Sequence, residues 1–470
     1  MDEPVPRAFR QRGVSLSLNR MSTIFGQPLS RRGLLRGGAL GFGWLAFSAL
    51  AGGAEVKSLA RIAARARRVI FLCMKGAPSH LDLISHKPQL NADAGKPGRR
   101  PGTTLRGTDW KFAQHGQSGH WMSELIPGVA SHADKLCVIH SVVTDLQAHA
   151  PAYLKMHTGV TQGARPSLGS WTHYGLGSLN ENLPGFITIT PPSCFGGPLN
   201  YGNAFLPAIH QGSPIGTDGQ PIATTVIPNL TPVLPRAAQR AELDLMQSFN
   251  RARLAREGSD PQVQGAIESF ELAYKMQSEM PAVMDLTKDS AATLKLYGIG
   301  EKETDDCGRK CLLARRMVEA GVRFVEVTHG DWDTHFNHRQ RMPALCQSVD
   351  KPIAGLLTDL DARGLLRDTL VIWSGEFGRT PHAEGSDGRD HHVSSFSLWM
   401  AGGGVKPGHI YGATDEHGYE VTDGKMDIHD WHATILHLLG LDHEKLTYRH
   451  GGREYRLTNL KGNVVPGVIG

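Results

Sequence analysis

The chain has 470 residues, of which 40% are hydrophobic and 20% are charged, and this composition excludes an intrinsically disordered protein. Its length allows one large α/β domain or two ordinary domains. The formal net charge of +5 is small for this length and comes partly from N-terminal arginines, so charge indicates no nucleic-acid partner. The 23 histidines are informative, because many lie beside acidic residues in the second half, and histidine serves as a metal ligand or near-neutral acid and base.

Residues 1–55 are typical of an export leader rather than of a folded domain. Arg31 and Arg32 precede a weakly apolar run at residues 37–51, which is too short for a membrane span. The arginine pair resembles a twin-arginine signal, and an accidental basic pair before a core helix is the alternative. We therefore expect the twin-arginine translocase as a partner, a periplasmic or secreted protein, and no stable membrane span in the mature form. Met21 is as good a start as the first methionine.

Residues 56–470 are predicted to form a single α/β domain. Six apolar, β-branched runs have the pattern of strands buried on both faces. These runs are residues 68–74, 136–140, 186–190, 322–327, 369–373 and 396–401. Helical patterns lie between them at residues 311–320 and 350–363, the second beginning at Asp350 and ending before Gly364. This alternation predicts βαβ units and a mainly parallel sheet sandwiched by helices.

The segment at about residues 234–290 is predicted to be a helical excursion from this domain. Within it, Val263, Ile267, Phe270 and Tyr274 recur at spacings of four, three and four residues, which places them on one face of a helix. The expected domain is therefore a sheet with one long helical addition.

The six cysteines are allowed to form disulfides in an exported protein, but the sequence does not choose among the fifteen possible pairings. Cys307 and Cys311 lie one helical turn apart, and no second pair with metal-ligand spacing follows them. We therefore expect both to have a buried structural role.

Polar and ionisable side chains follow four of the predicted strands, and ligands gather at the carboxyl ends of the strands in open α/β sheets. They are Lys75, Ser79, His80 and Asp82; Thr144, Asp145 and His149; His329, Asp331, Asp333 and His335; and Ser374, Glu376, Arg379, Arg389, Asp390, His391 and His392. Loops that need only to be soluble seldom contain so many histidines and carboxylates. We therefore predict one shared site at this edge of the sheet.

Two of these loops carry the sharpest candidates. Asp333 and His335 are two residues apart, so both can reach one divalent cation, although an aspartate in a turn also often caps backbone N–H groups. Glu376 lies in a glycine-containing turn that can direct it into a site. Arg379 is a candidate clamp for a sulfate, phosphate or carboxylate group, and an ion pair between the two that fixes the loop is the alternative. His391 and its neighbour offer further ligands, one of them structural.

The histidines of the C-terminal tail are predicted to be structural. Residues 430–439 have the pattern of an amphipathic helix, in which His432 and His437 satisfy packing contacts. Asp427 is at most a neighbour of the site.

Nine motifs in a fixed order mark a family resemblance. They are GAPSHLD (76–82), HAPAYLKMHTG (149–159), RPSLGSW (165–171), CLLARRMVEAGVRFVEV (311–327), DWDTH (331–335), TLVIWSGEFGRTP (369–381), GRDHH (388–392), AGGGVKPG (401–408) and HATILHLLGLDHEKL (432–446). With them the chain resembles a large family of exported bacterial proteins, domain of unknown function 1501, which is grouped near the sulfatases in the alkaline-phosphatase superfamily. The resemblance implies a sulfatase-like α/β fold over nearly everything after the leader.

The chain departs from true sulfatases at the positions that carry their chemistry. Sulfatases have a cysteine or serine nucleophile in a C-x-P-S-R stretch, and here His149 occupies that position before Ala150 and Pro151. The aspartate pair that ends the first strand in sulfatases has no counterpart at Lys75, and Glu376 stands where an Asp-His or Asp-Asn pair is expected. A covalent sulfatase route would need another nucleophile, for which Ser79 is a candidate.

The leading hypothesis is a metal-assisted hydrolase of sulfate or phosphate esters, on a small molecule or a polysaccharide. Its divalent cation (Ca, Zn, Mg or Mn) would be held by Asp333, His335, Glu376 and His391. Arg379 would hold the anionic group, and His149 would act as nucleophile, ligand, or acid and base. The second hypothesis is a catalytically silent member of the superfamily that binds an anionic glycan or scaffolds an exported complex. The sequence leaves the substrate, the metal and the oligomeric state open.

Overall fold

The computed structural model describes residues 60–470, so the predicted leader lies outside the described residues. Within this part of the chain, a nine-stranded sheet has the order β12-β4-β11-β8-β1-β7-β5-β6, with β15 paired to β4. The strands are β1 (Arg68–Met74), β4 (Leu136–Val143), β5 (Phe186–Ile189), β6 (Ser213–Ile215), β7 (Phe324–His329), β8 (Thr369–Ser374), β11 (Phe396–Ala401), β12 (His409–Tyr411) and β15 (Met426–Asp427). All six predicted strands are among them.

The sheet is mainly parallel, as predicted, with one antiparallel strand. β1 pairs in parallel with both β7 and β8, whereas β11 runs antiparallel to β8 and to β4. The reason is the connection between β8 and β11. The chain leaves β8 into the hairpin of β9 (Gly378–Glu384) and β10 (Gly388–His392) and then enters β11, with no crossover helix to reverse its direction.

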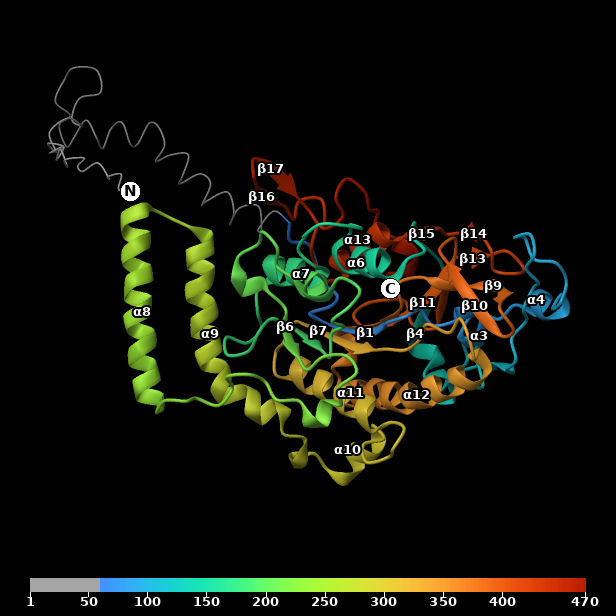
Figure 1. Ribbon diagram of the computed structural model, residues 1–470, viewed down its shortest axis with the longest axis horizontal. Coiled ribbons are helices and arrows are strands. Elements are labelled where there is room, and N and C mark those ends of the chain that lie inside the picture. Colours follow the sequence, from blue (N-terminus) through green and yellow to red (C-terminus); the bar gives the residue numbers. More distant parts are fainter. Residues whose placement is uncertain (1–59) are drawn as a thin grey trace, which may run out of the picture. The chain divides into compact units, whose positions relative to one another are not determined.

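Helices cover both faces of the sheet (Figure 1). Along β1, alternate side chains enter two separate cores: Ile70 and Leu72 pack toward α11 (Asp305–Glu319) and α12 (His338–Ala362). Val69 and Phe71 pack toward the helices on the other face. These helices are α6 (His149–Thr158), α7 (Leu168–Leu176) and α13 (Ile428–Leu438). The sandwich of helices around the sheet is therefore the predicted one.

Helix α12 begins twelve residues before its predicted start, at His338 rather than at Asp350. The Asp350 carboxylate does not cap its own helix. It accepts hydrogen bonds from the backbone N–H groups of Gly128 and Val129, each at 2.7 Å, at the start of α5 (Pro127–Ala130). Asp350 therefore has the sequence pattern of a helix N-cap, but in the structure its carboxylate makes a tertiary contact with the start of α5.

Residues 236–284, within the predicted excursion, form two helices that lie side by side (Figure 1). They are α8 (Arg236–Glu257) and α9 (Pro261–Met284). Asp260 caps α9 by accepting the backbone N–H groups of Gln262 and Val263, at 2.9 and 3.4 Å. Among the described residues, no helix is both long and apolar enough to span a bilayer.

The remaining elements are short. They are α3 (His80–Leu83), α4 (Pro88–Ala92), α10 (Ala291–Leu296), β2 (Phe112–His115), β3 (His120–Ser123), β13 (Ala413–Thr414), β14 (Val421–Asp423), β16 (Tyr448–His450) and β17 (Arg453–Tyr455). All six cysteines lie within residues 60–470 and are unpaired, and Cys307 and Cys311 are buried in α11.

Candidate metal centre

The residues of the predicted site come from four segments that meet at the carboxyl ends of parallel strands. His149 is the first residue of α6, after β4, and Asp333 and His335 lie in the loop after β7. His391 belongs to β10, which follows β8. Gly76, at the end of β1, has φ +102°, and a Cβ there would lie 2.7 Å from the backbone nitrogen of Asp333. Glycine at this position therefore lets the loop that carries Asp333 close over the central strand.

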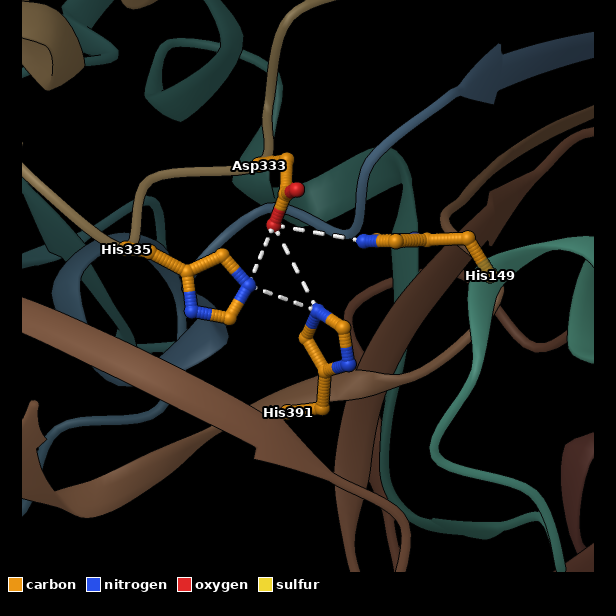
Figure 2. A group of neighbouring side chains, drawn as sticks. All are labelled: His149, Asp333, His335 and His391. Atoms are coloured by element: carbon orange, nitrogen blue, oxygen red, sulfur yellow. Dashed lines mark hydrogen bonds and ion pairs between the residues drawn. The ribbon is translucent and has the colours of Figure 1, made fainter.

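Four side chains converge on one point (Figure 2). The Oδ1 atom of Asp333 lies 2.9 Å from the Nε2 atom of His335, 3.2 Å from that of His149 and 3.4 Å from that of His391. The Nε2 atoms of His335 and His391 are 2.8 Å apart. All four ligand atoms lie within 4.8 Å of one another, which is the spacing expected around a single cation.

Each histidine is also held from behind through its Nδ1 atom. That of His149 lies 2.5 Å from Oε1 of Glu376. That of His335 contacts the carboxylate of Glu384, and that of His391 contacts the backbone carbonyl of Gln147. A carboxylate or a carbonyl oxygen only accepts, so each Nδ1 donates, and each neutral ring presents the lone pair of its Nε2 atom to the centre. A ring that is protonated in the absence of a metal donates from Nε2 to Asp333 instead, which lowers the pKa of Asp333. A carboxylate or carbonyl behind the imidazole is the usual arrangement around histidines that bind a metal.

Glu376 therefore lies behind the centre and is not one of the four converging groups. It is fully buried, and both of its oxygens accept the backbone N–H of Gly76, at 3.0 and 3.2 Å. His149, predicted to act in catalysis, is the fourth converging side chain. Its ring stacks on Phe195 at 4.9 Å and packs against Phe377 at 4.8 Å, so its orientation is set on both sides.

Arg379 is also fully buried and points at protein groups. Its guanidinium donates to the backbone carbonyls of Gly76 and Ala77, at 2.5 and 3.0 Å, and to Oδ1 of Asp333 at 2.5 Å. Burial alone would raise the pKa of Asp333, but His149, His391 and Arg379 hold it well below its usual range. The arginine thus keeps the carboxylate ionised and in place, and its donors are committed to the protein rather than to an anionic ligand.

Some polar residues at the strand ends belong to the frame of the site. Asp82 and Arg389 are both fully buried and form a two-point ion pair, with distances of 2.7 and 3.1 Å. His338 adds a contact to the same carboxylate at 3.0 Å. This buried pair anchors β10, and with it His391, to the segment that follows β1. Glu384 was not among the predicted residues, and its only sequence signal is its place in the same hairpin as His391.

The tail histidines make backbone contacts, as expected for structural residues. The Nε2 atom of His432 lies 2.7 Å from the carbonyl of Met156, and that of His429 lies 2.9 Å from the carbonyl of Gly159. Asp427 forms a capping box at the start of α13. These side chains join α13 to α6, the helix that begins with His149.

A second group, Cys73, His157 and Glu326, is buried beneath α6, and its ligand atoms also lie within 4.8 Å of one another. The Cys73 thiol contacts the Tyr153 hydroxyl at 3.1 Å, and burial raises the pKa of this thiol well above its usual value. Because the thiol is engaged by the Tyr153 hydroxyl, we interpret His157 and Glu326, 3.3 Å apart, as a buried ion pair.

This ion pair is expected to make stability depend on pH. Burial alone would lower the pKa of His157, but Glu326 outweighs it and the pKa is raised. The stabilisation is then complete below the unfolded-state pKa of about 6.5 and is lost as pH rises through the higher folded-state pKa. Chemical denaturation should show that His157→Gln costs more free energy of unfolding at pH 6 than at pH 9. A cost that is constant or larger at pH 9 would contradict the assignment.

The fold and the centre together define an α/β protein with a mainly parallel sheet, whose strand ends bring three histidines and one aspartate to a single point. The model of the family described as protein of unknown function (DUF1501) matches residues 66–469, and the chain belongs to this family. No curated protein matches the chain.

The solved structures that match include members of the sulfatase and alkaline-phosphatase class. The lipoteichoic acid synthase LtaP from Listeria monocytogenes is 7% identical, with 89% of this chain and 81% of that chain covered and a TM-score of 0.39. The PsFucS1 sulfatase from Pseudoalteromonas sp. is 14% identical, with 85% and 71% covered and a TM-score of 0.35. A magnesium-bound variant of TAB5 alkaline phosphatase is 11% identical, with 81% and 99% covered and a TM-score of 0.35. At these TM-scores the similarity carries no conclusion about function, which has to come from the residues of this chain.

Proposed function

We propose that the protein is a metal-assisted hydrolase of sulfate or phosphate esters that acts outside the cytoplasm. One observation supports this above the others: three imidazoles, each donating from Nδ1 to an outer partner, direct their Nε2 lone pairs at the same carboxylate oxygen of Asp333. Arg379 offsets the charge of Asp333 from the protein side, but the three Nε2 lone pairs still face one another and Oδ1, an arrangement that a cation between them would stabilise. The donor set therefore fits a divalent cation.

The nature of the donors favours zinc among the four metals considered. Three imidazoles and one carboxylate are ligands that suit Zn²⁺, whereas Ca²⁺ and Mg²⁺ prefer oxygen ligands throughout. His149, Asp333, His335 and His391 would hold the ion, which would need a fifth coordination position to supply Lewis acidity to an ester oxygen. Glu376 and Glu384 would keep the His149 and His335 rings oriented.

The proposal includes no covalent intermediate on Ser79 or His149, the two candidate nucleophiles in the sequence. Ser79 is fully buried and donates to Asp82, so it is directed away from the centre. The Nε2 atom of His149 is one of the four converging atoms. The route that these positions leave is direct attack by water on the phosphorus or sulfur atom, with the ester O–P or O–S bond breaking and the alcohol leaving. A cation held by the four residues would supply Lewis acidity to an oxygen of the ester.

Lys75 is proposed to hold the anionic part of the ester in place of Arg379. Its ammonium lies 5.5 Å from the ring centroid of Phe195, whose ring stacks on His149, so it lies on the same side as the centre. In the structure this ammonium forms an ion pair with the carboxylate of Asp218. A lysine that exchanges a carboxylate for a substrate oxyanion needs no new buried charge.

Metal analysis of the purified full chain tests the proposal. We expect about one equivalent of zinc per chain, removal of the metal by a chelator, and hydrolysis of an arylsulfate, an aryl phosphate or an aryl phosphodiester that is lost on chelation and restored by zinc. Protein that holds no divalent metal and cleaves none of these three esters would contradict it. Export by the twin-arginine translocase belongs to the same proposal, and the arginine pair at residues 31 and 32 supports it.

The second candidate function is a catalytically silent protein that binds an anionic glycan or scaffolds an exported complex. It is favoured by one observation. Among residues 60–470, none of the hydrogen bonds and ion pairs of the four converging side chains involves a serine hydroxyl or a cysteine thiol. Metal-loaded protein that binds a sulfated oligosaccharide and never cleaves it would select this candidate. Ester turnover that disappears on chelation would exclude it.

A further inference from the structure

A second pocket, of about 250 Å³, lies at the β4 edge of the sheet and shares no lining residue with the metal centre. Its floor includes Val138 and His140 of β4, and one wall is formed by the start of β3. The segments after α3 and around β12 and β13 complete it. The residues of this pocket that carry the argument are His86, Lys87, His120, Trp121, His140 and Thr414.

Trp121 presents a fixed aromatic surface to this pocket. The side chain is 41% exposed, although tryptophan is one of the largest apolar residues. Its ring packs against that of His86 at 4.4 Å, and His86 in turn stacks on Phe112 at 5.0 Å with an interplanar angle of 16°. The stack holds the indole in one orientation before any ligand arrives, which lowers the entropic cost of binding against it.

Two polar atoms at the pocket have no partner within residues 60–470. His120 is 1% exposed, and its Nε2 lies 3.2 Å from the backbone carbonyl of Leu136. A carbonyl only accepts, so Nε2 carries the hydrogen and the buried Nδ1 is an acceptor without a donor. The hydroxyl oxygen of Thr414 is likewise buried and unpartnered. Buried polar groups of this kind are normally satisfied, so both atoms have hydrogen-bonding capacity left for a ligand that brings hydroxyl groups.

The pocket has the chemistry of a site for an uncharged ligand. Its imidazoles do not bring three ligand atoms together in the way that the metal centre does. Burial lowers the pKa of His140 to about 3 and lowers that of His86, so both rings are neutral at pH 7. The ammonium of Lys87 already donates to the carbonyls of Thr414 and Asp415, at 3.3 and 2.9 Å. A polyanion would therefore find little charge to pair with.

We propose that this pocket binds a neutral sugar ring. The apolar face of the ring stacks on Trp121, and its hydroxyl groups donate to His120 and exchange hydrogen bonds with Thr414. Neutral imidazoles and hydroxyls each offer one donor and one acceptor, and sugar hydroxyls require the same pairing. The proposal stands independently of the hydrolase, because none of its residues belongs to the metal centre.

Titration of the full chain with neutral hexasaccharides tests the proposal. The probes are cellohexaose, xylohexaose, mannohexaose, laminarihexaose and chitohexaose, followed by calorimetry and by saturation-transfer NMR. We expect at least one of them to bind and Trp121→Ala to weaken its Kd at least tenfold. Phe249→Ala, which removes an exposed aromatic side chain from α8, is the matched control and should leave the Kd unchanged.

Thr414→Val keeps the test valid if the tryptophan variant folds poorly. The hydroxyl of Thr414 has no partner in the described protein, so its removal breaks no internal contact and should leave the melting temperature unchanged while weakening binding about threefold or more. Asp333→Asn should bind the sugar as the wild type does. The proposal is overturned if none of the five probes binds, if Thr414→Val and folded Trp121→Ala bind normally, or if folded Asp333→Asn loses the sugar. A protein partner captured through Trp121, with no sugar bound, would also overturn it.

Discussion

Asp333→Asn is expected to release the bound metal and to lower ester hydrolysis by about 10³-fold or more. The Oδ1 atom of Asp333 is the one atom that contacts all three converging histidines and Arg379. An amide supplies no negative charge to the cation, and losing several kcal/mol of charge stabilisation corresponds to a rate loss of about this size. Metal content by mass spectrometry and turnover of an aryl phosphate and an arylsulfate measure the two effects.

Two further variants separate this loss from a folding defect. Asparagine at position 333 also leaves the buried guanidinium of Arg379 without its carboxylate, which by itself destabilises the fold. His391 and Arg379 pair through the backbone in the β9–β10 hairpin, and within the described residues no side-chain hydrogen bond or ion pair joins them. His391→Gln should therefore lose metal with a smaller change in melting temperature. Asp331→Asn, two residues away and exposed, is the matched control and should keep both metal and turnover. Folded Asp333→Asn with normal metal content and normal turnover would refute the assignment of the centre.

Arg389→Met is expected to lower the free energy of unfolding by about 3–5 kcal/mol. Arg389 and Asp82 are both fully buried and share two short contacts, of 2.7 and 3.1 Å. Burial alone would raise the pKa of Asp82, but Arg389 and His338 hold it well below its usual value, so the carboxylate is ionised. Removing the arginine leaves the ionised Asp82 in the interior, in contact with His338 and the Ser79 hydroxyl but with no guanidinium to balance its charge.

Urea denaturation of the Arg389→Met protein measures the loss, and two comparisons give it meaning. The double variant Arg389→Met with Asp82→Leu should recover part of the stability, because it removes both charges. Arg339→Met, which breaks the 2.8 Å pair with Asp109 at the surface, should change stability far less than Arg389→Met does, because water screens an exposed pair. An Arg389→Met protein no less stable than the Arg339→Met protein would show that the buried pair contributes little. Loss of metal at normal stability would instead indicate that its main effect is on His391.

The strands were predictable because their signal is local. The run at residues 68–74 is apolar from Val69 to Met74, a pattern typical of a short strand buried on both faces by helices. The start of α12 was not predictable in the same way. Asp350 followed by Pro352 satisfies the rules for a helix start, and the contact that overrides them, with Gly128 and Val129, lies more than two hundred residues away in sequence.

The candidate site was predictable as a group and less so in its roles. Asp333, His335 and His391 follow strand ends, and parallel strands necessarily bring such residues together. Whether Glu376 contacts a cation directly or through His149 depends on how the turn after β8 faces the first residue of α6. Arg379 follows a glycine at a strand end. Nothing in the sequence distinguishes an arginine whose side chain is exposed in a cleft from one whose side chain is buried beneath it.

The order of strands in the sheet has a consequence for how the chain acquires its structure. β1 lies in the middle of the sheet, yet its two neighbours, β7 and β8, begin at residues 324 and 369. During synthesis both edges of this apolar strand therefore stay unpaired until roughly 250 to 300 further residues have been added. Such long-range pairing is slow and exposes the strand to aggregation. We therefore expect a chaperone that covers β1 during translation to raise the yield of folded protein.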